Sequence, residues 1–470
     1  MNRREFLSSA AGAALAATDI YALVDKFAEA PVRAAASSLP IEQHVLQGVR
    51  VVVDDGVEVL VPPLHHEVIT LALEAGTSRG ELLAARAALE EALVELERQY
   101  EPTPAGLGIT VAWGLPYFRS YVPAAAARYL PVDRRASRAR RVRVPVLLSA
   151  VRFASDPKET ILERNNAAVL LRSDRLEAIE EAATLLTGLA FWRPNSIRRG
   201  FAGGGFDGGV GLPKKMALEA GVPGAELISD RAELFLGFTS TQKNGLGPER
   251  IANIETLGYS DGGPDGYFRG GTTMHLSHLF EDLEAWYRKS YGERVARAFQ
   301  PPVGLIDVPH GTLTIPSTDP DTGPIDIRGN AHDYHAYRAI GHSASLQPTT
   351  RLKRDVRGAD GGLYKRGTAI PQRADFNTLD NPFFWSADTA RDRLSPNPAA
   401  GLHFVVFHPT SDDFHRSRRA MDGVMPDGTT LPFQPRARGQ GLNSVLRTTH
   451  RQNFLVPPRR HRSFPLAELV

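Results

Sequence analysis

Three features are missing from this sequence of 470 residues, and each absence excludes a class of protein. Cysteine is absent, which excludes disulfide bonds, thiolate-bound metal ions and iron–sulfur clusters. No apolar run reaches the length of about 18 residues that a membrane-spanning helix needs, so no membrane span is predicted. An excess of charge is missing too, because 55 Lys and Arg stand against 53 Asp and Glu, and this balance predicts no nucleic-acid partner.

The residues that are present have the composition of a globular protein. Hydrophobic residues make up 42% of the chain and charged residues 23%. A chain of this length buries a large core and is too long for one ordinary domain. We therefore expect two domains.

The N-terminus has the pattern of a twin-arginine export signal. Asn2–Leu7 reads Asn-Arg-Arg-Glu-Phe-Leu, and Ser8–Ala17 is a weakly apolar stretch of small residues. An ordinary basic N-terminus explains this less well, because Phe6 and Leu7 follow the two arginines in register. We predict a signal region over residues 1–38, with its cleavage point left open, and a periplasmic or extracellular location.

Hydrophobic periodicity predicts strands and helices in the first half of the chain. Arg79–Tyr100 repeats apolar residues at helical spacing, and Ser78 with Glu81 has the sequence of a capping box. Asp174 is expected to cap a second helix. The other predicted segments are a hairpin at 49–53 and 57–61, strands at 107–114 and 167–174, and a helix at 175–189. Helices on one face of antiparallel strands indicate an α+β domain.

Arginine is concentrated in one stretch between the first two predicted sheet strands. The cluster consists of Arg128, Arg134, Arg135, Arg138, Arg140, Arg141 and Arg143. A basic patch for an acidic partner is one interpretation. A solvated loop is favoured, because aromatic residues do not interleave with the arginines as they do in nucleic-acid sites.

The stretch Arg338–Thr368 holds the most specific chemical pattern in the chain. His342 follows an apolar pair, Pro348 comes six residues later, and Arg366-Gly367 lies near the end. A neutral imidazole is a good ligand for iron. A guanidinium keeps its proton and stabilises the negative charge that grows as a peroxide bond breaks. A solvated turn with one histidine and one arginine has the same composition, so the pattern needs support from the rest of the chain.

In this order the residues resemble the dye-decolourising peroxidases, a family of haem proteins. In that family a histidine in a short segment before a proline holds the haem iron. An arginine before a small residue reaches over the opposite face of the haem. By this resemblance His342 is expected to be the proximal ligand of haem b and Arg366 the distal cation. The resemblance covers roughly residues 105–458 and depends on the order of its motifs.

The resemblance also implies a fold. It implies an α+β fold of two ferredoxin-like domains with antiparallel sheets, arranged like a barrel, with the haem pocket mainly in the second. We expect an N-terminal domain at 39–258 and a C-terminal haem-binding domain at 259–470. Segments that match the family's second domain are helices at 279–286 and 411–422, a strand at 401–407 and the closing run at 447–458.

The position of the family's catalytic acid is where this sequence departs most. The family has Leu-Gly-Phe-x-Asp-Gly, whereas here Leu236-Gly237-Phe238 is followed by Thr-Ser-Thr, with Ser240 in place of the aspartate. A serine cannot take and return a proton as a carboxylate does. The Gly-rich loop at 199–209 contains Gly-x-x-Asp-Gly, which makes Asp207 a second candidate for the acid. The flanking residues fit the family better at Ser240.

A histidine pair at His275 and His278 is a further candidate for metal binding. The surrounding segment, Thr273–His278, alternates in the manner of a strand at a sheet edge. Alternation puts the two rings on opposite faces, which argues against a shared metal ion.

The sequence thus predicts an exported haem-dependent peroxidase that reduces hydrogen peroxide and oxidises an external electron donor. Turnover is expected to be slow, because Ser240 replaces the acid. Two alternatives stay open: a haem-binding relative that is not a peroxidase, and a haem-free structural or partner-binding protein. The site and not the fold distinguishes them. The donor and the oligomeric state are not indicated.

Overall fold

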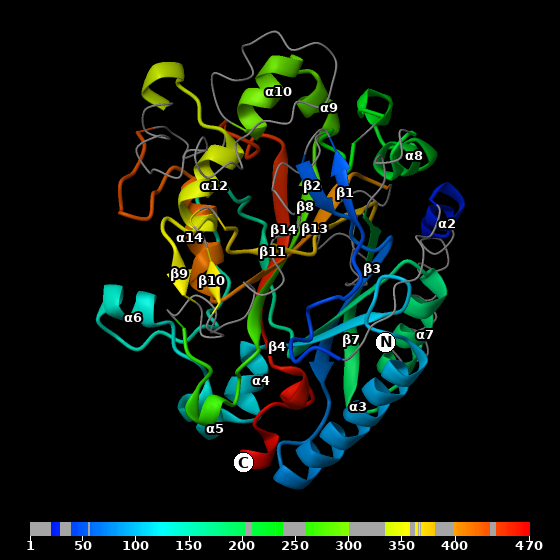
Figure 1. The fold of residues 1–470 in the computed structure, drawn as a ribbon, viewed down its shortest axis with the longest axis vertical. Helices are drawn as coiled ribbons and strands as arrows, with labels where there is room; N and C mark the ends of the chain where they lie inside the picture. The colour runs from blue at the N-terminus through cyan, green and yellow to red at the C-terminus, as the bar shows by residue number, and fades with distance from the viewer. Residues whose placement is uncertain are drawn as a thin grey trace.

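The fold is taken from a computed structural model. It describes residues 20–28, 39–54, 57–202, 209–230, 232–237, 260–299, 334–357, 362–364, 366, 368–380, 398–432 and 439–470. Within them, helices pack on a large, mainly antiparallel sheet of ten strands, which is the expected α+β class. Figure 1 shows this sheet between α3 and α7 on one side and α12 and α14 on the other.

The first half of the sheet follows the order strand, helix, strand, strand, helix, strand. Its elements are β3 (His65–Leu73), α3 (Arg79–Gln99), β4 (Gly108–Gly114), β6 (Ala167–Ser173), α7 (Leu176–Thr187) and β7 (Trp192–Phe201). In space the strands lie in the order β7-β3-β6-β4, and each neighbouring pair is antiparallel. This is the ferredoxin-like arrangement.

The second half repeats the same order of elements. They are β8 (Thr272–Glu281), α9 (Leu283–Tyr287), α10 (Tyr291–Ala298), β12 (Phe376–Thr378), β13 (Gly401–His408), α14 (Ser411–Met421) and β14 (Leu446–Val456). Their spatial order is β12-β13-β8-β14, again antiparallel throughout. The expectation of two ferredoxin-like units is therefore confirmed. The expected domain boundary at 258/259 lies outside the described residues.

Two short ladders join the halves into a closed ring. Leu455 of β14 pairs with Trp113 of β4, and Asn377 of β12 pairs with Phe201 of β7. The ring therefore runs β7-β3-β6-β4-β14-β8-β13-β12 and returns to β7. Two short strands extend this sheet, β11 (Gln372–Arg373) beside β13 and β5 (Ile161–Leu162) parallel to β14.

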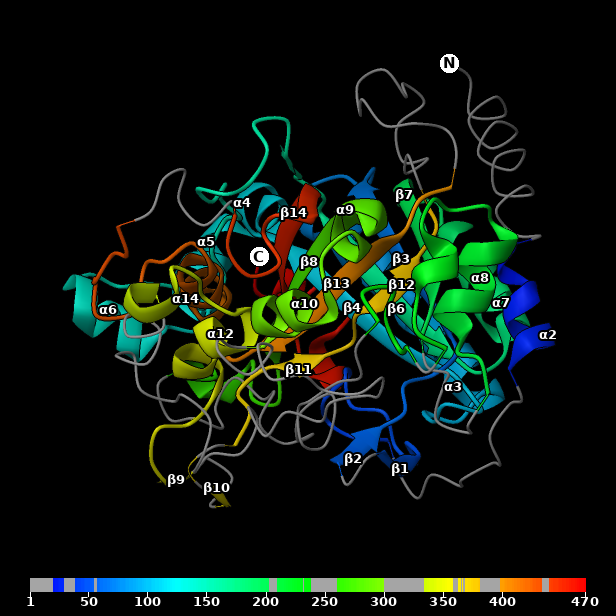
Figure 2. The ribbon, with the colours of Figure 1, turned by 90° about the horizontal axis from the view of Figure 1, so that it is seen from above.

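Apolar residues fill both sides of the ring. Val68, Leu170 and Met274 belong to a buried cluster inside it. Outside, α3 and α7 cover the first half with a buried stripe that includes Leu89 and Ile179. Helices α12 and α14 lie on the far side of the sheet from α3 and α7, as Figure 2 shows from above.

The remaining α-helices and strands are short. They are α2 (Leu23–Phe27), β1 (Val51–Asp54), β2 (Val57–Leu60), α4 (Leu115–Ser120), α5 (Pro123–Tyr129), α6 (Arg134–Arg140), α8 (Leu212–Glu219), α12 (His342–Thr350), β9 (Val356–Arg357) and β10 (Leu363–Tyr364). No helix among the described residues is both long and apolar enough to cross a membrane.

Several predicted elements are confirmed and two are corrected. Helix α3 has the predicted capping box, with the Ser78 side chain accepting from the Glu81 N–H. The helix expected at 279–286 is shorter, because β8 continues to Glu281 through ladder pairs with β13 and β14. The expected cap Asp174 instead accepts a hydrogen bond from the Leu64 N–H at 3.0 Å, and Arg175 occupies the N-cap.

The arginine cluster lies partly on a helix rather than in a loop. Arg135 Nη1 lies 2.6 Å from Asp413 Oδ1, and Arg140 Nη2 lies 2.7 Å from Asp412 Oδ1. Both carboxylates lie in the first turn of α14. Part of the cluster therefore fastens α6 to α14 instead of forming a free basic patch.

Residues 20–28, within the expected signal region, pack on the folded chain. Tyr21 is buried, and its hydroxyl donates to Asp380 Oδ1 at 2.9 Å. Asp25 Oδ1 lies 2.7 Å from His65 Nε2. These contacts tie the segment to the end of β3 and to the residues that follow β12.

Candidate functional site

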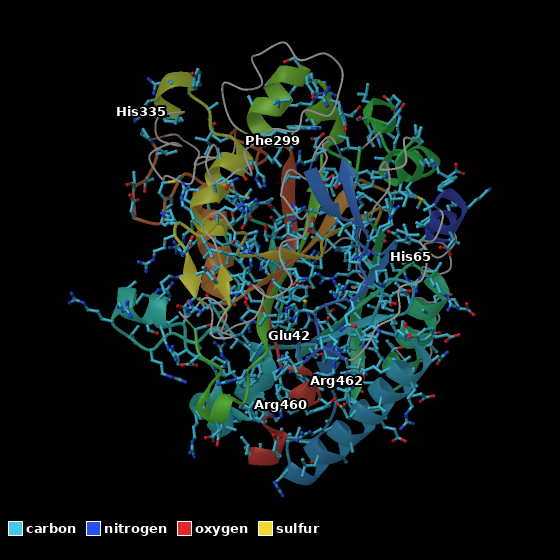
Figure 3. The ribbon with its side chains drawn as sticks, in the orientation of Figure 1. Glu42, His65, Phe299, His335, Arg460 and Arg462 are labelled. Atoms are coloured by element: carbon cyan, nitrogen blue, oxygen red, sulfur yellow. The ribbon has the colours of Figure 1, made fainter. Side chains whose placement is uncertain are left out.

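His342 is the first residue of helix α12 and not part of a loop as predicted. Gly341 is the N-cap with extended backbone (φ −87°, ψ 152°), and its carbonyl accepts a hydrogen bond from the Ser345 hydroxyl at 2.6 Å. The Ala344 N–H donates to the Phe299 carbonyl at 3.0 Å, which ties the first turn to the end of α10. Phe299 is labelled near the top of Figure 3. These contacts fix the backbone that carries the imidazole.

The His342 imidazole is neutral at physiological pH. Burial, together with the positive charges of Arg373 and Arg418, lowers its pKa to about 4. Its Nδ1 is buried and has no hydrogen-bond partner among the residues that the structure describes. A neutral ring keeps a lone pair for a metal ion, which is the state that iron ligation requires.

The guanidinium groups of Arg373 and Arg418 act on this histidine, and Arg351 caps the far end of its helix. Arg373 lies on β11, and its Nε is 3.5 Å from Asp375 Oδ1. Burial lowers the pKa of Arg351 to about 10, with a further contribution from the charge of Arg373. Arg418 of α14 binds Asp422 at 2.7 Å. Arg373 and Arg418 each lie beside a carboxylate, and the charges of both still act on the His342 ring.

Helix α12 is held against the sheet through α14. The Thr349 hydroxyl lies 3.0 Å from the Ser417 hydroxyl of α14. On its other side α14 packs on the sheet, where Phe414 stacks on the ring of His275 at a centroid distance of 3.4 Å. The site thus lies on the outer face of the ring, above β8 and β13.

A buried carboxyl whose pKa is influenced by Asp375 was not identified from the sequence. Glu281 ends β8, and its Oε2 is buried without a hydrogen-bond partner in the described part of the chain. Burial, together with the negative charge of Asp375, raises the pKa of Glu281 to about 8. The carboxyl is therefore mainly protonated at neutral pH. The only signal in the sequence was a lone acidic residue at the end of an otherwise uncharged strand.

The other predicted site residues are placed less fully. Arg366 is exposed beyond β10, and its backbone N–H donates to Asp355 Oδ1 at 2.9 Å. Gly367, Asp207 and Ser240 lie outside the described residues. The distal role expected for Arg366 and the acid role of Asp207 therefore stay predictions.

The histidine pair on β8 does not share a ligand. His275 Nδ1 lies 2.6 Å from Asn453 Oδ1, whereas His278 Nδ1 lies 2.7 Å from Thr449 Oγ1. The two rings are on opposite faces, as predicted, but β8 is paired on both sides and is not an edge strand. Within the described ranges, no group of three or more His, Asp or Glu side chains is arranged to hold a metal ion.

Comparison with known proteins assigns the chain to a family. A family model described as "Family of unknown function (DUF7405)" matches residues 63–458, so the chain belongs to this family. No curated protein matches the chain.

The chain is similar in structure to dye-decolourising-type peroxidases. A haem complex of a DypB variant from Rhodococcus jostii RHA1 has 12% identity and a TM-score of 0.47, over 86% of this chain and 96% of that one. A putative DyP-type peroxidase from Shewanella oneidensis has 14% identity and a TM-score of 0.47, over 87% and 95%. A dye-decolorizing peroxidase from Bacteroides thetaiotaomicron VPI-5482 has 12% identity and a TM-score of 0.48, over 91% and 98%. The fold was assigned above from the order of the strands in the sheet, and not from these similarities.

Proposed function

We propose that this protein binds haem b through His342 and acts as a peroxidase of low activity. The observation that carries the proposal is the state of His342: a neutral imidazole with a buried Nδ1 that has no described partner. His342 is the first residue of α12, in the stretch that resembles the proximal segment of dye-decolourising peroxidases.

The residues around His342 fit a haem group. Neutral imidazole is a standard axial ligand of haem iron. The charges of Arg351 and Arg373 are suited to the carboxylates that haem carries. When bound, haem supplies the iron at which hydrogen peroxide is reduced while an external donor is oxidised. His342 would hold the group, and the arginines would orient it.

A charged arginine is needed to stabilise negative charge on the peroxide. Arg366 is the residue that the family resemblance favours. Arg373 is a second candidate, because its charge acts on His342, and in that case Arg351 alone would orient the haem carboxylates. Replacing each in turn by leucine separates the two.

Proton transfer is the weakest part of the proposed site. Ser240 stands where the family has its acid, and Asp207 is the tentative substitute. General acid–base catalysis typically contributes a factor of about 10²–10⁴, so turnover should be lower by about that factor. The missing acid also favours the alternative of a haem-binding protein that is not a peroxidase. We also propose export by the twin-arginine route, on the motif at Asn2–Leu7.

The test is peroxide-dependent oxidation of an external dye by haem-loaded protein. Wild type should turn over slowly, Ser240→Asp should raise the rate, and Asp207→Asn should change it little. Arg366→Leu should abolish the residual rate, and loss in Arg373→Leu instead moves the distal role to Arg373.

Two outcomes would count against this proposal. A collapse in Asp207→Asn, with Ser240→Asp inert, places the acid at Asp207. Absence of peroxide-dependent oxidation in wild type and in Ser240→Asp, both loaded with haem, leaves the haem-binding alternative.

A further inference from the structure

One end of the ring of strands is closed by the segment around residues 42–47. Glu42 forms a β-bridge with Pro458, and Gln43 Nε2 donates to the Pro457 carbonyl at 2.6 Å. Figure 3 labels Glu42 close to Arg460 and Arg462 of the C-terminal segment, in agreement with this bridge. The next residue, His44, is completely buried as a result.

Arg172 and His66 face the inside of the ring next to this segment. They are direct partners in the ladder between β6 and β3, so their side chains lie side by side on one face of the sheet. Val68 and Leu170, two residues along on the same face, belong to the interior cluster. Arg172 is 3% exposed and His66 2%.

His44 completes the group from the closing segment. Its carbonyl accepts a hydrogen bond from Arg172 Nη2 at 2.7 Å. Its ring lies against Phe407 of β13 at a centroid distance of 4.8 Å, as the ring of His66 lies against Phe376 at 4.9 Å. Arg172 and two imidazoles therefore meet in the interior between aromatic walls.

Five nitrogen atoms in this group lack a hydrogen-bond partner. They are both ring nitrogens of His44, both of His66, and Nε of Arg172, all buried and unpartnered within the described part of the chain. More than nine in ten buried polar groups in native proteins are paired. Five unpaired nitrogens on three neighbouring buried side chains indicate a missing ligand.

The group also carries an unbalanced charge. Burial alone lowers the pKa of Arg172 to about 10, so the guanidinium stays positive at neutral pH. No Asp or Glu in the described ranges forms an ion pair with it. By contrast Arg198, the interior residue opposite Val68 on β7, binds Glu163 at 2.5 Å. An isolated buried charge is costly, so a counter-ion is expected at Arg172.

The two histidines supply hydrogen bonds without adding charge. Burial lowers the pKa of His44 to about 3 and that of His66 well below its usual value, and the charge of Arg172 acts in the same direction on both. Each neutral ring therefore offers one N–H. Together with Arg172 Nε–H they make three donors around a single positive charge.

We propose that Arg172, His44 and His66 bind one small monovalent inorganic anion, of the size of a halide, inside the ring. One negative charge balances the guanidinium, and three N–H donors match an ion that only accepts hydrogen bonds. A metal cation does not fit, because the guanidinium repels it. This site lies on the inner face of the sheet and does not depend on haem.

Salt-dependent thermal unfolding of the full-length protein tests the site. Chloride is exchanged for gluconate at constant ionic strength, and wild type is compared with Arg172→Met. The difference in unfolding midpoint between the two should grow with chloride, by about 2 °C for each tenfold increase above the dissociation constant. It should not grow with gluconate. Arg172→Met removes a buried charge rather than creating one, so it should fold.

Arg198 and Glu163 provide the matched control. The double variant Arg198→Met, Glu163→Gln removes a buried interior guanidinium together with its partner, and it should keep the chloride response of wild type. The same response to both salts in wild type and Arg172→Met would overturn the proposal. Crystals grown in bromide should show an anomalous peak beside Arg172, and ordered water alone at that position would equally overturn it.

Discussion

At the scale of single residues, Glu281 is a buried carboxyl whose pKa differs strongly between the folded and the unfolded chain. Its unfolded-state pKa is near 4.5, and in the folded chain burial and the charge of Asp375 raise it to about 8. Between these two values the unfolded chain releases the proton and the folded chain keeps it. The contribution of Glu281 to the free energy of unfolding is therefore highest below pH 4.5, and it is lost as the pH rises to 8.

Replacing Glu281 by glutamine should remove this loss. At pH 8 the free energy of unfolding of Glu281→Gln should exceed that of wild type by on the order of 2–4 kcal/mol, and at pH 4 the two should be similar. Denaturant unfolding at both pH values measures this. Asp375→Asn is the companion variant, because it should lower the pKa of Glu281 and shrink the difference. Equal stability of wild type and Glu281→Gln at pH 8 would show that the carboxyl is not held protonated.

Sequence patterns identified the candidate ligand but not its surroundings. His342 was found by its place among motifs, yet its position at a helix start depends on Gly341 and on the contact of Ala344 with Phe299. Arg373 and Arg418 come near it only through the pairing of β11 and the packing of α14. Such neighbours are set by tertiary packing, which local patterns do not encode.

At the scale of elements, the segment with α2 makes contacts with the folded chain that an export signal does not need. The Tyr21 hydroxyl accepts from the Leu379 N–H at 3.0 Å and donates to Asp380, and Val24 is fully buried. Cleavage at the end of the predicted signal region, residues 1–38, would remove these contacts from the mature chain. The folded precursor and the processed protein should then differ in stability.

Truncation at two points tests the contribution of α2. Removing residues 1–38 should lower the free energy of unfolding by about 2–5 kcal/mol, because it deletes buried apolar surface and the Tyr21 hydrogen bonds. Removing residues 1–19 leaves α2 in place and is the control. If the two truncated proteins unfold at the same midpoint, α2 contributes nothing to the fold.

Elements with strong local signals were predicted well. The capping box of α3, the hairpin of β1 and β2, and the apolar strand β13 all follow from local sequence. The end of β8 was not foreseen, and the barrel-like closure was expected from the family resemblance and not from local sequence. Both depend on ladders such as Leu455 with Trp113, which join residues far apart in the chain.

At the scale of the whole molecule, the closed ring separates two kinds of site. His342 on α12 and Arg418 on α14 lie on the outer face of the sheet, whereas Arg172 with its two histidines lies inside. The sheet between them is continuous, because β4 pairs with β14 and β7 with β12. The haem proposal and the anion proposal can therefore fail or succeed separately.

The absorption spectrum of the purified protein titrated with haemin tests the central claim most directly. Wild type should give a Soret band that saturates at one haem per chain, and His342→Ala should lose it or bind far more weakly. His335→Ala is the control, because His335 is exposed in the same segment and is labelled in Figure 3. No Soret band in wild type, or an unchanged band in His342→Ala, would contradict the account.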